Sequence, residues 1–485
     1  MHPENTPETH RTTIKGVPGR RRFWLGTFLV ILLLASCRGA AADDWLYARA
    51  TDEVWSPPVD SGPPARLPQV GLVTYDAAKQ EPSSETRQLF VGYDNGFVIA
   101  NQGTERVSRD DFPFLMRVKG WSQIRYISFS SEGPNPDENT FSLERLRLSL
   151  AGHAYSPNLQ YFLQFDGNSD RSMQTIVLDS FVSYDLGRDL FGCDANQVGI
   201  RAGVWKVPFS RSREESARQL QFTERSVGDH FFDINRAIGV GLYGEMDAFS
   251  TPVVFETALT NGFRTAGVST RRGEGLDRNF GWSLRTHTDL FSEFGNDGEP
   301  DLSWHPAPAL RLGSGIALTR VDAEGEREFS RQRVVNSGAT LASLLPPSVD
   351  AYDVDFFTLD AQWKYRGFSL IAEYSWRYMT GFSGGSVPSL LDHGLLLQTG
   401  YFVCPQKLEL LFRWGPIVGN SGTLGVTEQS SNEIAAGFAW YFKGHNAKLG
   451  FDASHVTGVP VTGDRLDLVP GDIGWLFRTQ FQFGF

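Results

Sequence analysis

The chain contains little sulfur and no long apolar run in most of its length. Its 485 residues include 3 cysteines and 5 methionines, and the cysteines have neither the spacing of a metal site nor that of a redox pair. Beyond residue 42 there is no run of 18 apolar residues, which excludes a membrane-spanning helix there. The 50 glycines and 36 phenylalanines indicate turns and aromatic strands instead. The composition therefore predicts an all-β fold.

The first 42 residues have the pattern of a signal peptide. Basic residues up to Arg22 precede an apolar run from Phe23 to Ala35, which is too short to span a membrane as a helix. Two cleavage sites compete, because a lipobox-like sequence ends at Cys37 and three alanines end at Ala42. We expect cleavage after Ala42, since a protein embedded through strands needs no acyl anchor. Lipidation of Cys37 stays open.

The mature chain is acidic. Without residues 1–42 it has 39 Lys and Arg against 54 Asp and Glu, a net charge of −15. This charge argues against nucleic acid as a partner. Residues 43–112 comprise a Pro- and Ser-rich linker, expected in the periplasm, and a short β-like segment from Leu89 to Ala100.

Residues 113–485 contain sixteen strand-length segments of alternating hydrophobicity. They lie near 114–129, 140–152, 158–167, 175–186, 197–206, 237–247, 253–263, 279–290, 308–321, 354–365, 367–378, 392–403, 407–415, 431–442, 446–456 and 474–485. Short and long links between them largely alternate, as do the periplasmic turns and outer loops of a membrane barrel. One link, 291–307, is long where a short turn is expected.

The last segment shows the alternation most clearly. Trp475, Phe477 and Phe481 fall on one face, and Arg478 and Gln480 fall on the other, as expected for a lipid face and a wet face. A soluble β-sandwich would also alternate. Sixteen such segments, an export signal and a terminal aromatic residue favour a 16-stranded antiparallel transmembrane β-barrel in the outer membrane, in contact with its lipids.

Several motifs in residues 89–485 resemble the phosphate-selective porin O and P family. The residues that carry the resemblance are Gly92–Phe97, Gly120, Gln123, Arg125, Tyr126, Gly203–Arg211, Phe222–Ser226, Arg236–Val240, Asn261, Gly262 and Phe481–Phe485. The resemblance implies a channel for small anionic solutes such as phosphate, a homotrimer, and an inward-folded constriction loop at Val207–Arg236. The final Phe485 is similar to the signal that the barrel-assembly machinery reads.

The expected loop departs from a basic constriction, since its five arginines are balanced by five acids. The alternation of side chains along each strand nevertheless places basic residues on the water-facing side, where they would attract anions into a narrow pore. The predicted pore-lining, anion-binding residues are Arg117, Lys119, Arg125, Arg145, Arg147, Arg201, Arg211, Arg213 and Arg225. The alternative is that these residues pair with acids and only stabilise the wall. We predict a weak to moderate anion preference.

Two other function classes were weighed. A barrel hydrolase needs a nucleophile, a base and an orienting group together, but the nine histidines are scattered and no Ser-centred elbow occurs. We therefore predict no enzyme, catalytic residue, cofactor or metal ligand. An adhesive or envelope-structural barrel is the other alternative, which conductance in a bilayer would distinguish from a porin.

Overall fold

The computed structural model describes residues 89–101, 114–167, 174–191, 197–248, 251–266, 275–425, 427–461 and 465–485. The predicted signal peptide, with Cys37 and Ala42, and the linker up to residue 88 lie outside the described residues. Their boundaries stay predictions.

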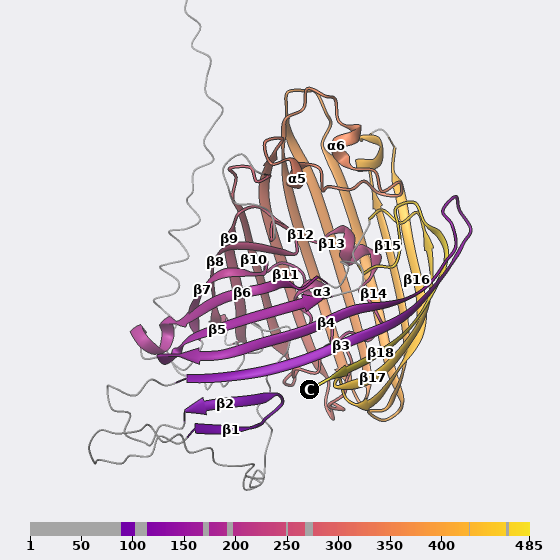
Figure 1. Ribbon diagram of the computed structural model, residues 1–485. Helices are drawn as coiled ribbons and strands as arrows, with labels where there is room; N and C mark the ends of the chain where they lie inside the picture. Colours follow the sequence, from indigo (N-terminus) through magenta and orange to yellow (C-terminus); the bar gives the residue numbers. More distant parts are fainter. Residues whose placement is uncertain are drawn as a thin grey trace, which may run out of the picture. The chain divides into compact units, whose positions relative to one another are not determined.

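Sixteen antiparallel strands, β3 to β18, form one closed barrel, as predicted (Figure 1). Each strand pairs with the next along the chain, and β18 closes the sheet by pairing with β3. The strands are β3 (Phe114–Ser131), β4 (Glu138–Ala154), β5 (Ser156–Gly167), β6 (Ile176–Asp185), β7 (Val198–Lys206), β8 (Arg236–Ala248), β9 (Thr251–Thr260), β10 (Gly281–Leu290), β11 (Ala309–Asp322), β12 (Ala351–Tyr365), β13 (Phe368–Ser383), β14 (Leu390–Cys404), β15 (Leu408–Gly419), β16 (Gln429–Lys443), β17 (Ala447–Thr457) and β18 (Ile473–Gly484).

Side chains along the strands alternate between an exposed outer face and a buried inner face. In β18, Trp475, Phe477 and Phe481 are exposed, whereas Arg478 and Gln480 are buried. The outer aromatic side chains suit contact with lipid, and the inner polar side chains suit an aqueous or hydrogen-bonded interior. The two faces predicted for the last strand are those observed.

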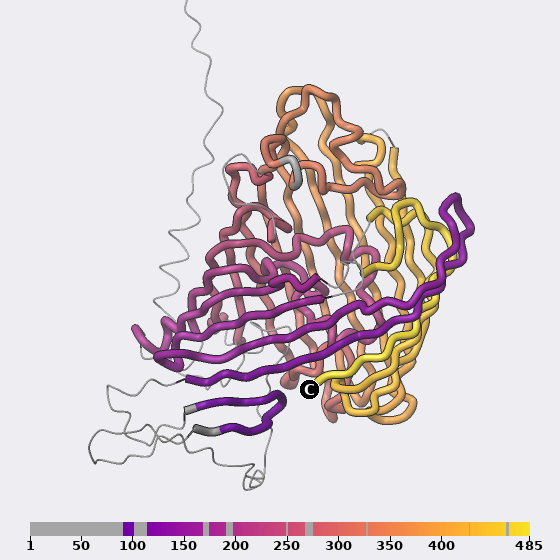
Figure 2. Tube along the Cα trace, viewed as in Figure 1, coloured from indigo at the N-terminus to yellow at the C-terminus, as the bar shows by residue number. Residues whose placement is uncertain are grey.

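A hairpin before the barrel extends the seam between the first and last strands. It consists of β1 (Leu89–Tyr93) and β2 (Phe97–Asn101), and β2 pairs with the start of β3. The Phe485 backbone N–H donates to the Gly120 carbonyl at 2.9 Å, and the Phe485 ring lies 5.5 Å from the ring of Phe97. Figure 2 shows the hairpin beside the C-terminus. The edge of β3 is therefore shared by β18 and the hairpin.

The connections assign the two ends of the barrel. Short links join β4 to β5, β12 to β13, β14 to β15 and β16 to β17, and this end is periplasmic because outer-membrane barrels have short periplasmic turns. The opposite end has the long loops 207–235, 261–280, 323–350 and 458–472. The long link 291–308 joins β10 to β11 on the periplasmic side and leaves the strand count unchanged.

Two of the outer loops pack against the inner face of the wall. Phe209 and Ile234 of loop 207–235 and Leu341 of loop 323–350 share one apolar cluster with Tyr352 and Phe356 of β12. The short helical segments are η2 (Gly187–Phe191), α3 (Arg211–Glu214), α4 (Val227–Phe231), α5 (Glu326–Phe329), α6 (Leu341–Leu344) and η3 (Ser421–Thr423). Among the described residues, no helix is long and apolar enough to cross a membrane. Buried apolar surface thus holds outer loops inside the barrel.

Candidate functional site

Residues 207–235, here called the constriction loop, cross the interior and bind several strands of the wall. The Ser212 hydroxyl donates to Glu373 of β13 at 2.5 Å, and the Thr223 hydroxyl donates to Asp452 of β17 at 2.5 Å. The Val227 N–H donates to Glu433 of β16 at 2.7 Å. Wall carboxylates therefore accept hydrogen bonds from the loop along its length. The constriction loop follows β7, the fifth strand of the barrel. Its hydrogen bonds to β13, β16 and β17 confirm that it is folded inward.

Glu224 ties the constriction loop to the first strands of the barrel. Its carboxylate lies 3.1 Å from Arg125 Nη2 and 2.6 Å from Arg145 Nη2. All three side chains are buried. Burial raises the pKa of Glu224, but Arg145, His230 and Arg125 outweigh it and hold this pKa well below its ordinary value. Glu224 is therefore a charged anchor between the loop and the wall.

The three loop arginines predicted from the sequence are buried and paired. Arg211 lies 3.3 Å from Glu299, and Arg213 lies 2.6 Å from Asp233. Arg225 donates from Nε to the Ser212 carbonyl at 2.9 Å. These contacts order the loop, and they also place the three guanidinium groups in the interior of the barrel.

The predicted wall residues divide between the interior and the seam. Arg147 lies 3.5 Å from Asp166, and Arg201 lies 2.6 Å from Glu256; Lys119 is also buried. Arg117 binds Asp94 in the turn of the hairpin at 2.8 Å, beyond the end of β18. Arg117 is thus separated from the cluster around Glu224. The pore-lining role of all nine predicted residues is taken up below as a proposal.

In the first part of the constriction loop, up to Val227, the least buried residues are acidic rather than basic. From Val207 to Val227, every residue is buried except Glu214 and Glu215, which are half-buried. Glu214 lies 3.5 Å from Arg285 of β10 and keeps 27% of its side-chain surface exposed. This part of the loop therefore presents carboxylates more openly than its buried guanidinium groups.

A sequence model of the family described as phosphate-selective porin O and P matches residues 118–485. The chain belongs to this family. Family and fold together indicate an outer-membrane channel for small solutes rather than an enzyme. A search of the curated proteins returns no match.

Solved structures of porins resemble the fold of this porin at low sequence identity. An anion-selective porin from Comamonas acidovorans has a TM-score of 0.50 and 12% identity, with 77% of this chain and 100% of that chain covered. The channel DcaP of Acinetobacter baumannii has a TM-score of 0.47 and 9% identity, with 78% and 99% covered. Salmonella typhi OmpF in complex with daunomycin has a TM-score of 0.46 and 11% identity, with 76% and 98% covered.

A second outer loop of the porin reaches the cluster around Glu224. Asp467, in loop 458–472, lies 2.5 Å from Arg125 Nη1, and Arg465 in the same loop pairs with Asp166 of β5. Burial raises the pKa of Asp467 to about 7, although Arg125 opposes this shift. The interior network therefore joins two outer loops to β3, β4 and β5.

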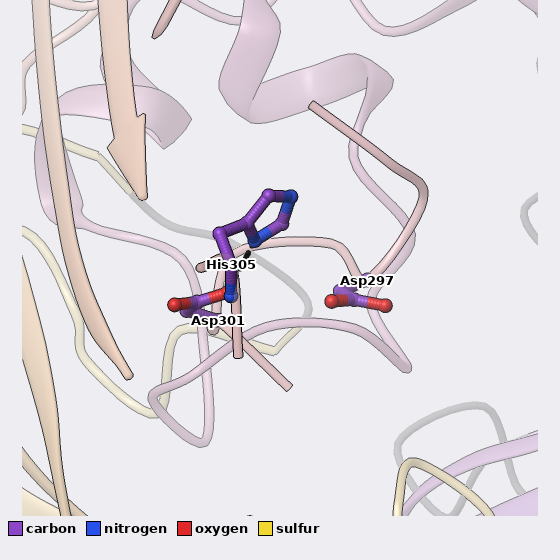
Figure 3. Close-up of side chains that lie close together, drawn as sticks. All are labelled: Asp297, Asp301 and His305. Carbon is purple, nitrogen blue, oxygen red and sulfur yellow. Dashed lines mark hydrogen bonds and ion pairs between the residues drawn. The ribbon is translucent and has the colours of Figure 1, made fainter. Parts of the chain in front are cut away.

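The periplasmic link 291–308 contains three residues whose ligand-type atoms lie within 4.8 Å of one another: Asp297, Asp301 and His305. Figure 3 shows the His305 ring joined to Asp301, with Asp297 to one side. The two carboxylates accept hydrogen bonds from backbone N–H groups, Asp297 from Ser303 at 2.6 Å and Asp301 from Gly367 at 2.7 Å. We assign these residues to holding the link in place rather than to a metal site.

Sequence reasoning missed the acids that organise the interior. Glu224, Glu299 and Asp467 lie in connections between strands. The two-residue alternation of a strand does not apply there, so it cannot predict the direction of a side chain. Two of these acids had a signal in the sequence: Glu224 lies in the Phe222–Ser226 motif that carries the family resemblance, and Glu299 lies in the link that is too long for a periplasmic turn. Parity did place the wall partners, such as Arg125 and Arg145, on the inner face.

Proposed function

We propose that this porin conducts small inorganic anions, phosphate among them, with a weak to moderate preference over cations. The description of the family supports the proposal, and one structurally similar protein, from Comamonas acidovorans, is described as anion-selective. The proposed residues are the interior members of the predicted set: Lys119, Arg125, Arg145, Arg147, Arg201, Arg211, Arg213 and Arg225. Arg117 is included as a residue at the periplasmic end of β3.

The observation that carries the proposal is a set of buried cationic donors. Lys364 Nζ and Arg145 Nε are buried on the inner face, and neither has a hydrogen-bond acceptor among the described residues. A buried donor without an acceptor costs about 1–3 kcal/mol, and more when it is charged. A phosphate or chloride ion supplies both an acceptor and the opposite charge. Such donors favour anions inside the barrel, whereas buried carboxylate oxygens that have no donor in the described part of the chain, at Glu144 and Asp360, limit this preference.

Carboxylates limit the expected preference. Glu214 and Glu215 are half-buried in the constriction loop, and charges within one Debye length of an ion, about 8–10 Å, act on it with little screening. Acids on outer loops that lie farther from an ion than this distance are largely screened from it. We therefore expect the charges inside the pore, rather than the net charge of −15, to determine the ion preference.

The test is the reversal potential of the purified porin in a planar bilayer under a potassium chloride gradient. We expect an anion preference that decreases when Lys364→Gln removes one interior cation. Arg278→Gln is the matched control, because the Arg278 side chain is 73% exposed at an outer loop. Clear cation preference of the unaltered protein would refute the proposal.

We also propose the biogenesis and assembly expected from the sequence. These are removal of residues 1–42, recognition of the strand ending in Phe485 by the barrel-assembly machinery, and a homotrimer. Phe485 is consistent with a terminal signal because it closes the seam against Gly120. The intact mass of the mature protein, the yield of folded barrel after Phe485→Ala, and the mass of the detergent-solubilised oligomer test the three points separately.

A further inference from the structure

Residues 291–308 form a segment, here called the strap, that crosses the periplasmic mouth of the barrel. The strap begins after β10 and contacts the turns of three other strand pairs. The Gly367 N–H donates to Asp301, Gln406 Nε2 donates to the Leu302 carbonyl at 2.8 Å, and His445 Nε2 lies 2.8 Å from the Asp297 carbonyl. These turns follow β12, β14 and β16, so the strap reaches far around the rim from its own strands.

The strap is fastened to the constriction loop by Glu299. One carboxylate oxygen lies 3.3 Å from Nη1 and Nη2 of Arg211. The other accepts from the Gln221 N–H and from Gln398 Nε2 of β14, each at 2.9 Å. Burial raises the pKa of Glu299, but Arg211 and the Gln221 N–H outweigh it and lower this pKa below its ordinary value. Glu299 is therefore charged, and both of its carboxylate oxygens have partners at this contact.

The backbone of the strap also touches the constriction loop. Gln219 donates from Nε2 to the Asn296 carbonyl at 2.8 Å, and the Glu299 N–H donates to the Gln219 carbonyl at 3.3 Å. Gly298 has φ +72°, and a Cβ placed there would lie 2.4 Å from the Gln219 Cβ. Only glycine fits this close approach without strain. Gly298 therefore allows the strap to contact the constriction loop, which enters from the opposite end of the barrel.

We propose that the strap narrows the periplasmic mouth of the channel, and that Glu299 fastens it to the constriction loop and thereby limits both conductance and anion preference. The effect on charge preference rests on the anion function proposed above, whereas the effect on conductance does not. Because β10 and β11 are paired up to Leu290 and Leu310, a short turn would suffice to join them. The strap is therefore longer than the connection between β10 and β11 requires, and its extra residues can act at the periplasmic mouth.

The experiment compares single-channel conductance in planar bilayers for the full-length porin and three variants, each first shown to be a folded barrel by heat-dependent gel mobility. Replacing residues 292–307 by a short Gly-Ser turn should raise conductance at least about twofold, because it removes the obstruction at the mouth. Glu299→Ala should give a smaller rise and a reversal potential shifted towards anions. Glu293→Gln, an exposed acid of the same strap, should change neither quantity.

The outcomes separate the two proposals. A folded variant without the strap that conducts like the full-length porin would overturn the strap proposal, whatever the ion preference. A rise in conductance together with cation preference of the unaltered protein would support the strap and refute the anion function. If Glu299→Ala does not fold, Gln219→Ala replaces it, because it removes the bond to Asn296 without altering charge.

Discussion

The constriction loop and the strap enter the same barrel from opposite ends and are held by different interactions. The constriction loop buries aromatic side chains such as Phe209 and Phe231 in apolar clusters and adds the buried Glu224 ion pairs. The strap buries Phe294 and packs the partly buried Leu302 and Trp304 against the cluster around Phe222. It is also fixed by hydrogen bonds to backbone groups, with Asp301 and Glu299 as acceptors. Apolar burial gives the constriction loop the larger share of stability, because each hydrogen bond contributes only about 1 kcal/mol net.

This difference suggests which of the two segments moves. A segment that buries less apolar surface opens locally at a lower free energy than one packed more deeply into apolar clusters. We therefore expect the strap to detach while the constriction loop stays in place. The first three predictions below test this contrast, and the fourth concerns a separate outer loop.

The largest effect is expected from Glu224→Ala in the constriction loop. The substitution leaves Arg125 and Arg145 buried without the carboxylate they share, and loss of one partner from a buried pair costs about 3–5 kcal/mol. Denaturant titration in detergent, followed by gel mobility, measures the free energy of unfolding. Glu428→Ala, at an exposed position, should have no comparable effect. Equal stability of the two variants would show that Glu224 is not an anchor.

Truncation of an apolar anchor should come next. Phe209 is 1% exposed, and its ring lies 5.9 Å from that of Phe356 of β12. Phe209→Ala should lower the free energy of unfolding by about 3 kcal/mol, because burial is lost and a cavity remains. Phe291→Ala is the control, since Phe291 begins the strap with 77% of its surface exposed. A loss below about 1 kcal/mol for Phe209→Ala would contradict apolar anchoring of the loop.

A smaller and local effect is expected from Asp301→Ala in the strap. The substitution removes the acceptor for the Gly367 N–H and for the N–H and Nδ1 of His305, which costs about 1–3 kcal/mol. We expect faster protease cleavage within residues 291–308, with the constriction loop still protected. Mass spectrometry of the first fragments identifies the cleavage sites. First cleavage within residues 207–235 would reverse the proposed order of mobility.

The smallest effect concerns the pH dependence of the outer loop 323–350. Burial raises the pKa of Glu328 in α5 to about 8, so the folded loop holds a proton that the unfolded chain releases near pH 4.3. The loop therefore loses stability as pH rises from about 4.3 to 8, and the loss levels off above that range. Glu328→Gln should remove this dependence and make the loop more resistant to cleavage at pH 8, because the amide cannot ionise.

The readout for Glu328→Gln is the rate of protease cleavage in loop 323–350 at pH 5 and pH 8. Glu324→Gln serves as the control, because the Glu324 side chain is 69% exposed in the same loop. The unaltered porin and the control should both be cleaved faster at pH 8 than the Glu328→Gln variant. The same pH response in all three proteins would exclude Glu328 as its origin.

Much of the barrel followed from the sequence. Period-two alternation in segments such as 474–485 predicted both faces of each strand, because a one-residue shift would move charged side chains into lipid. The alternation of short and long links predicted which end of the barrel is periplasmic. The family resemblance added the inward fold of the constriction loop. These features depend on neighbouring residues or on motifs, which a single sequence displays.

The sequence by itself determined the strand count and the faces of the strands. Only the tertiary structure decided the partners of the interior cations and the path of the strap. The Arg211–Glu299 contact joins residues 88 positions apart in two irregular segments, where no periodic pattern fixes the direction of a side chain. Link 291–307 was recognised as unusual from its length. Its passage across the mouth depends on backbone hydrogen bonds to distant turns, which no pattern along the chain encodes.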